Sequence, residues 1–208
     1  MLTEKTVRGA LDAFASSDPT PGGGSAAALA GAMGSALLLM VARMPKTRAG
    51  SEEERTNLAA AVAVLAPLCT LLTNAMDADA AAYDRVVAAY RLPKATDTEK
   101  ASRSAAIQRA LHGATEVPLG VLRAAVEALR QARRIAAHGY GAAASDVGVA
   151  IAMLAAAARG AALNVDVNLG SLKDAGFVET VHAERQRLAA EADALRREGD
   201  ALLDLGSR

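Results

Sequence analysis

The chain has 208 residues, a formal net charge of zero, and 52% hydrophobic but only 2% aromatic residues. The balanced charge argues against nucleic acid as the main partner, because phosphate binding needs an excess of Lys and Arg. The single cysteine, Cys69, excludes an internal disulfide, and its leucine neighbours indicate a buried thiol. Ala-rich runs, without the β-branched and aromatic residues that strands favour, predict an all-α fold.

The first two helices are expected over about 3–15 and, after a loop at 19–24, from there to about residue 44. The uncharged stretch 19–42 is long enough to span a bilayer. Its Ala, Gly and Ser contribute little insertion energy, so we expect a helix buried in a soluble bundle and no membrane partner. Small residues recur in it every four positions, which predicts close helix packing inside the subunit or at a dimer axis: Ala27, Gly31 and Ser35.

Two capping boxes, Ser51 with Glu54 and Thr96 with Glu99, mark the starts of two further helices. A kink is expected at Pro67, and Pro118 is expected to begin another helix. Ser145 and Asp174 are expected to begin the last two. The predicted helices after the linker at 45–50 therefore run over about 51–90, 96–113, 118–138 and 145–164, and from 174 onward.

The last predicted helix carries an apolar residue every seven positions, a stripe that must pack against the core or a second subunit. No internal repeat or domain boundary interrupts the chain. We therefore expect one helical domain over residues 1–208, a bundle of about six to eight helices. The stripe consists of Val181, Leu188, Leu195 and Leu202.

One face of the third predicted helix is apolar or amphipathic except for Asp79. A carboxylate on a buried stripe is costly unless it is paired or hydrogen-bonded. Asp79 is therefore either a structural partner of Tyr83 or of an arginine on another helix, or a functional acid or base. Asp77 and Asp84 lie off this face and are expected to be solvated. The stripe is Leu58, Val62, Leu65, Cys69, Leu72, Met76, Asp79, Tyr83, Val86 and Tyr90.

A glycine-rich loop, Pro19-Thr20-Pro21-Gly22-Gly23-Gly24-Ser25, leads into the second helix. Exposed N–H groups at such a helix start suit an anionic or carbonyl-bearing ligand. The alternative is a tight connection whose glycines permit close packing. The loop is not a Walker loop, because no Gly-Lys-Ser/Thr follows, and it lacks the strand that precedes a Rossmann fingerprint.

Polar residues also flank the predicted helix that begins at Ser145. Asp146, in its first turn, either stabilises the helix start or serves a site. Asn164 and Asn168 either cap the helix end or hydrogen-bond a polar heterocycle. Four arginines on the preceding helix, Arg123, Arg130, Arg133 and Arg134, are expected to form a solvated face, and the scattered His112, His138 and His182 argue against a zinc site.

Several of these features match, in order and spacing, the motifs of a known family. The first is Pro19-Thr20-Pro21-Gly22-Gly23-Gly24-Ser25-Ala26-Ala27-Ala28. Then come Asp79-x-x-Ala82-Tyr83, Tyr90-Arg91-Leu92-Pro93-Lys94, Glu99-Lys100-x-x-Arg103, Thr115-Glu116-Val117-Pro118-Leu119, Ser145-Asp146-Val147 and Leu163-Asn164-Val165-x-Val167-Asn168. Nearly the whole chain thus resembles the methenyltetrahydrofolate cyclohydrolase and formiminotetrahydrofolate cyclodeaminase family.

The resemblance implies a multihelical, cytoplasmic homodimer that acts on a folate-bound one-carbon unit without a permanently bound cofactor. Members hydrolyse 5,10-methenyltetrahydrofolate to 10-formyltetrahydrofolate, or cyclise 5-formiminotetrahydrofolate with release of ammonia. A stand-alone cyclohydrolase is the first expectation. The alternative is a non-catalytic member that binds folate or a partner protein through the same pocket.

Roles for individual residues follow from the same resemblance. Asp79 is the first candidate for general acid and base, and Asp146 the second. Lys94 and Arg103 would meet the glutamate carboxylates of folate. The chain departs from the family pattern by lacking a Tyr in the loop 44–49 and by carrying Tyr140 where a short amide is common. The residues expected to orient the pterin or the one-carbon bridge are Gly22, Gly23, Gly24, Ser25, Tyr83, Asn164 and Asn168.

Overall fold

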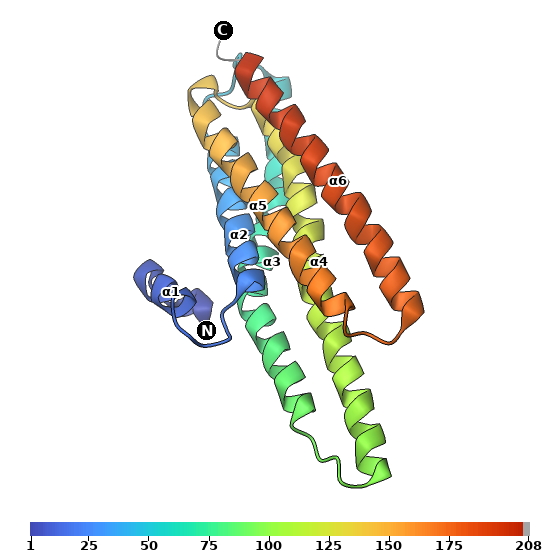
Figure 1. The fold of residues 1–208 in the computed structure, drawn as a ribbon. Helices are drawn as coiled ribbons and strands as arrows, with labels where there is room; N and C mark the ends of the chain where they lie inside the picture. The colour runs from blue at the N-terminus through green and yellow to red at the C-terminus, as the bar shows by residue number, and fades with distance from the viewer. Residues whose placement is uncertain (206–208) are drawn as a thin grey trace.

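The computed structural model describes residues 1–205, and in this range it contains α-helices, two short 3-10 helices and no strand (Figure 1). The predicted all-α fold is confirmed, with six α-helices in the described part. In chain order the elements are η1 (Leu2–Glu4), α1 (Val7–Phe14), α2 (Gly23–Ala42), α3 (Glu52–Tyr90), α4 (Asp97–His138), η2 (Gly141–Ala143), α5 (Ala144–Leu169) and α6 (Ala175–Leu205).

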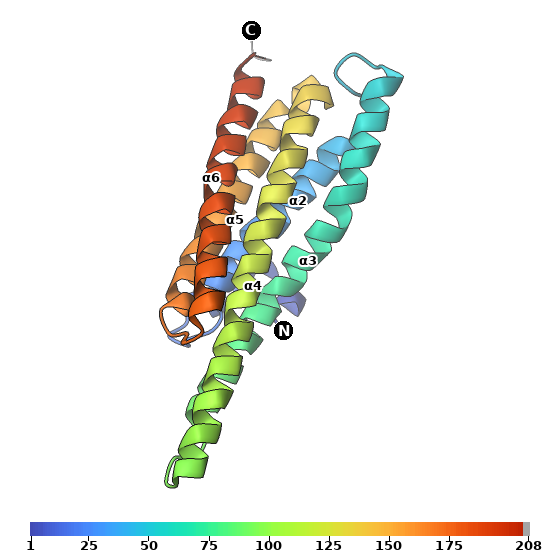
Figure 2. The same ribbon diagram turned by 90° about the vertical axis from the view of Figure 1, so that its right-hand side faces the viewer.

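Helices α2 to α5 pack side by side, and α6 covers the side formed by α4 and α5 (Figures 1 and 2). The most extensive contact joins α2 to α5, followed by α3 with α4. The long helices α3 and α4 continue as a hairpin beyond the ends of α5 and α6 (Figure 2). This arrangement places the start of α2 beside the middle of α3 and the end of α5.

The small residues of α2 bring α5 very close, as their spacing predicted. A side chain at Gly34 would put its Cβ 2.9 Å from the Ala150 carbonyl oxygen, and one at Gly160 would meet the Cβ of Ala27 at 3.0 Å. Neither glycine can carry a side chain without a shift of the facing helix. The close packing therefore occurs inside the subunit.

Three segments, Gly23–Ala42, Glu52–Tyr90 and Gly141–Leu169, are long and apolar enough to cross a membrane, judged by length and composition. In the first of them 61% of the most apolar window is buried inside the bundle, against 28% and 39% in the other two. The apolar surface of α2 is therefore largely used by the protein itself, as expected for a core helix.

Both predicted capping boxes form, at Ser51 with Glu54 and at Thr96 with Glu99. The structure corrects several other predicted helix ends and caps. The helices expected over 96–113 and 118–138 are one helix, α4, which continues through Pro118. Helix α5 begins at Ala144 without a side-chain cap, so Ser145 does not cap it, and it runs on to Leu169 instead of ending near residue 164.

The apolar stripe of α6 packs against the core, the first of the two expected alternatives, with Val181 and Leu188 only 3% exposed. The four α4 arginines are exposed, as expected of a solvated face. Three of them also pair with glutamates that recur every seven residues along α6. These pairs are Arg123 with Glu184 at 2.7 Å, Arg130 with Glu191 at 2.5 Å, and Arg133 with Glu198 at 3.1 Å.

Asp77 is a further correction, since it is not simply solvated. Its carboxylate accepts hydrogen bonds from the backbone N–H of Leu2 and from the Thr3 hydroxyl, both at 2.5 Å. Although partial burial opposes them, these bonds hold the pKa of Asp77 below its usual value. Asp77 thus ties the N-terminal segment to α3, whereas Asp84 is exposed as expected.

Candidate active site

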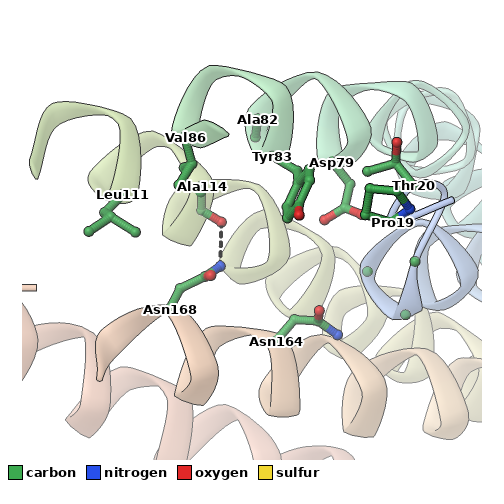
Figure 3. A pocket seen from close by; sticks show the side chains of 13 residues that line it. Pro19, Thr20, Asp79, Ala82, Tyr83, Val86, Leu111, Ala114, Asn164 and Asn168 are labelled. Atoms are coloured by element: carbon green, nitrogen blue, oxygen red, sulfur yellow. Dashed lines mark hydrogen bonds between the residues drawn. The ribbon is translucent and has the colours of Figure 1, made fainter. Parts of the chain in front are cut away.

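A cavity of about 320 Å³ lies where α2 begins, between α3, α4 and α5 (Figure 3). This volume is at the lower end of the range for small-molecule sites. The cavity combines apolar walls with a few polar groups from segments far apart in the chain. Its lining residues are Pro19, Thr20, Gly22, Gly23, Gly24, Asp79, Ala82, Tyr83, Val86, Leu111, Ala114, Asn164 and Asn168.

Asp79 reaches the first turn of α2 from the neighbouring helix α3. The N-cap of α2, Gly22, has no side chain to accept from the first N–H groups, and the Asp79 carboxylate accepts from the backbone N–H of Ser25. This approach requires glycine at position 24, where a Cβ would lie 2.6 Å from the Asp79 Cγ. The glycine loop therefore permits close packing of a carboxylate against a helix start.

Two opposing effects act on the Asp79 carboxyl group. Burial raises its pKa above the usual value, because a desolvated carboxylate is costly. Hydrogen bonds from the side chain and backbone of Ser25 favour the ionised form and offset part of this effect. The net direction is upward, which brings Asp79 closer to the range in which a carboxyl group can both accept and return a proton.

The partner of Asp79 is Ser25, and not Tyr83 or an arginine as the sequence alone suggested. The Ser25 Oγ lies 2.9 Å from Asp79 Oδ2 and 2.8 Å from the Met76 carbonyl oxygen. The residue is fully buried and does not line the cavity. Its side chain is therefore placed to hold Asp79, which corrects the expectation that it orients the substrate directly.

Tyr83 stands one turn beyond Asp79 on α3, and both side chains lie on the cavity side of this helix (Figure 3). The predicted stripe is buried at Leu72 and Met76, half-buried at Asp79, and opens at Tyr83, which is 42% exposed. The stripe thus passes from the core to the cavity at Asp79, which is why a polar residue follows apolar ones on the same face.

The wall opposite α3 carries two amides from α5, and neither caps the helix end. The Asn164 side chain donates to the Gly160 carbonyl at 2.8 Å, which leaves its own oxygen free to accept. Asn168 donates at 2.8 Å to the carbonyl of Ala114 on α4 (Figure 3).

The hydrogen bond from Asn168 compensates for Pro118 inside α4. Proline has no N–H to offer the carbonyl four residues earlier in a helix, and at this position that carbonyl belongs to Ala114. Asn168 supplies the missing donor. The sequence pointed to Asn168 as a candidate, but its partner Ala114 was missed; the only available signal was the spacing of four residues from Pro118.

Three predicted site residues lie away from the cavity. Asp146, in the first turn of α5, is 18 residues from Asn164, or roughly 27 Å along the helix. Lys94 is exposed in the turn between α3 and α4. Arg103 donates to the Tyr90 carbonyl oxygen, at 3.0 Å from one of its terminal nitrogens, and stacks 5.5 Å from the Tyr90 ring centre. One copy of the chain therefore does not bring Asp146 to Asp79, and the two cations lie further out along the hairpin.

Residues 6–187 match the model of the family described as formiminotransferase-cyclodeaminase. The chain belongs to this family. A methenyltetrahydrofolate cyclohydrolase from Methylorubrum extorquens is 43% identical over 195 residues, which cover 94% of each chain. A formimidoyltransferase-cyclodeaminase from Sus scrofa is 32% identical over 98% of this chain, which corresponds to 37% of the pig protein.

The family fold is also found in a solved structure. The formiminotetrahydrofolate cyclodeaminase from Thermotoga maritima superposes with a TM-score of 0.86 over 98% of both chains, at 24% sequence identity. At this identity the likeness establishes the helical architecture of the formiminotransferase-cyclodeaminase family for this chain.

Proposed function

We propose that this protein hydrolyses 5,10-methenyltetrahydrofolate to 10-formyltetrahydrofolate. The observation that carries the proposal is Asp79, a half-buried carboxyl group and the only carboxyl group among the described residues that line the cavity. The methenyl carbon is already an electrophilic amidinium, so attack by water needs only a general base, and release of the nitrogen needs a general acid. The 43% identity to a cyclohydrolase supports this choice of reaction.

Asp79 can supply both proton transfers in the order that the chemistry requires. As the carboxylate it accepts a proton from water while the oxygen bonds to the methenyl carbon. As the acid it returns that proton to N5 while the bond between N5 and this carbon breaks. The remaining hydroxyl proton leaves to solvent, so one water is consumed and one proton is released in converting the cationic substrate.

Cyclodeamination of 5-formiminotetrahydrofolate is the second candidate. It is favoured by the similarity of 98% of this chain to part of the pig formimidoyltransferase-cyclodeaminase. Here N10 of the folate attacks the carbon of the protonated formimino group and ammonia leaves, so a cationic substrate gives the cationic methenyl product. The same carboxyl group would accept the proton of N10 and donate one to the departing nitrogen.

The remaining parts of the proposal concern binding and assembly. Tyr83, Asn164 and the glycines of the α2 start would orient the pterin, and Asn168 would hold the wall beside it. Lys94 and Arg103, further along the hairpin, would meet glutamate carboxylates of an elongated folate. We further propose a cytoplasmic homodimer that needs no permanently bound cofactor and has no nucleic acid or membrane partner.

The test is the loss of methenyltetrahydrofolate absorbance with purified protein, above the spontaneous hydrolysis rate. Asp79→Asn should lower the turnover at least 100-fold, the contribution expected of a general acid and base. Asp84→Asn is the matched control, because Asp84 is an exposed aspartate on the same helix. If the wild-type protein shows no acceleration with either folate but is stabilised by them against heat, the non-catalytic alternative replaces the proposal.

A further inference from the structure

Three oxygen atoms form a short chain beneath the cavity. The Ser25 Oγ stands between the Met76 carbonyl oxygen, 2.8 Å away, and Asp79 Oδ2, 2.9 Å away. Ser25 is 0% exposed, so water does not compete for its hydroxyl group. Both contacts are of ordinary hydrogen-bond length.

A hydroxyl group carries only one proton, whereas both neighbours of Ser25 are acceptors when Asp79 is ionised. In that state the hydroxyl donates to the carboxylate and leaves the Met76 carbonyl with its helical bond alone. When Asp79 is protonated, its carboxyl O–H donates to Ser25, whose own proton then turns to the Met76 carbonyl. Each protonation state of Asp79 thus has its own hydrogen-bond arrangement around the same three heavy atoms.

We propose that Ser25 is a positioning residue that serves both protonation states of Asp79 by turning its single hydroxyl proton between Asp79 and the Met76 carbonyl. The inference rests on the proposed function, in which Asp79 accepts a proton and returns it within one turnover. Because no heavy atom has to move, the carboxyl group keeps its place against the substrate in both steps. A partner that could only donate would favour the ionised form alone.

The other titratable groups on the surrounding helices do not pair with Asp79. Tyr83 is the only other titratable residue among the described residues that line the cavity. On α3 itself, Asp77 bonds the N-terminal segment. His112 on α4 stacks against Phe177, and Asp166 on α5 pairs with Arg185. Helix α2 contributes only Ser25, so this residue is the main polar influence on the Asp79 proton.

The test titrates Asp79 by NMR in protein labelled with ¹³C at aspartate carboxyl groups, with its resonance assigned by its loss in Asp79→Asn. Removal of the hydroxyl in Ser25→Ala weakens the ionised form more than the neutral form, because hydrogen bonds to charged groups are the stronger ones. The pKa of Asp79 should therefore rise. Ser35→Ala is the matched control, since Ser35 is equally buried on α2 and its Oγ has no hydrogen-bond partner in the described part of the chain.

Turnover provides the second readout. At a pH above the Asp79 pKa of both proteins, Ser25→Ala should lower kcat roughly tenfold and leave KM unchanged, because the fully buried side chain does not touch substrate. The acid limb of its pH profile should move to higher pH. If Ser25→Ala does not fold, Ser25→Cys keeps a weak donor and acceptor and should shift the pKa in the same direction.

The outcomes separate the two proposals. If the pKa of Asp79 is the same in Ser25→Ala and Ser35→Ala, or if the folded Ser25→Cys variant leaves it unchanged, the role of Ser25 is overturned whatever the activity. If Ser25→Ala raises the pKa of Asp79 but the wild-type protein turns over neither folate, the coupling between Ser25 and Asp79 is kept and the proposed function is rejected.

Discussion

Replacing Gly24 with alanine would add a methyl group where α2 begins and Asp79 approaches it. The new Cβ would lie 2.6 Å from the Asp79 Cγ and 2.8 Å from its Oδ2. Carbon atoms in contact prefer about 3.5 Å or more, so the carboxyl group has to move by roughly 1 Å. Asp79 is the group that yields, because the facing atoms belong to its side chain and not to the backbone of α3.

The cost should appear in catalysis and hardly in stability. A misplacement of roughly 1 Å can lower turnover by about 100-fold. The move also stretches the 2.9 Å contact between Asp79 and Ser25. Alanine meanwhile favours the helix over glycine by about 0.5–1 kcal/mol, which offsets part of the strain.

The assay compares kcat and Tm in the same protein preparations. Gly120→Ala is the control, because Gly120 lies within α4 and a Cβ there would meet nothing within 4 Å. This control should raise Tm by a few degrees and leave kcat unchanged. Wild-type turnover in Gly24→Ala would refute the reasoning, since Asp79 would then not depend on the close approach to α2.

Three further predictions concern stability. Burial raises the pKa of Asp79, so the ionised carboxylate destabilises the fold; this cost is absent below the unfolded pKa and grows as pH rises through the folded pKa. Asp79→Asn should therefore raise Tm at neutral pH but not in acid. A lower Tm at neutral pH would contradict this prediction. A hydrogen bond from Thr47, aided by backbone N–H groups, lowers the pKa of Glu54 from 4.5 to about 2, so the stability it adds is present above pH 4.5 and lost towards pH 2. Glu54→Gln should therefore lower Tm at neutral pH and remove this acid-dependent loss, which thermal melts across pH would measure. Asn168→Ala should lower the free energy of unfolding by about 1–3 kcal/mol, because it leaves the Ala114 carbonyl unpaired. Pro118→Ala restores the missing N–H and should cancel most of that cost. Additive effects of the two substitutions in a urea double-mutant cycle would disprove the link.

Local signals predicted much of the fold. A capping box involves only four consecutive residues, so Ser51 and Thr96 predicted helix starts that the structure confirms. Pro118 misled the prediction because a proline inside a helix leaves a carbonyl unpaired. Its compensation comes from Asn168, 50 residues later, and no local pattern announces such a partner.

The candidate site could also be predicted only in part. The periodicity of α3 singled out Asp79, because a charge on an apolar face is visible from spacing alone. The identity of its partner depends on how α2 docks against α3, so Ser25 could not be paired with it in advance. Asp146 was predicted as a catalytic candidate because it is a carboxylate in a family motif. In the structure it lies roughly 27 Å along α5 from the cavity wall at Asn164, so residue type and motif alone did not place it at the site.

The two departures from the family pattern meet each other in the structure. The loop that lacks the expected tyrosine places Lys46 over the ring of Tyr140, 5.5 Å from its centre, and the same loop pairs with the end of α4 through Thr47 and Gly139. This contact lies beyond the C-terminal end of α2, whereas the cavity is at its N-terminal end, 20 residues or roughly 30 Å away. Within one copy of the chain, neither change reaches Asp79 or Ser25.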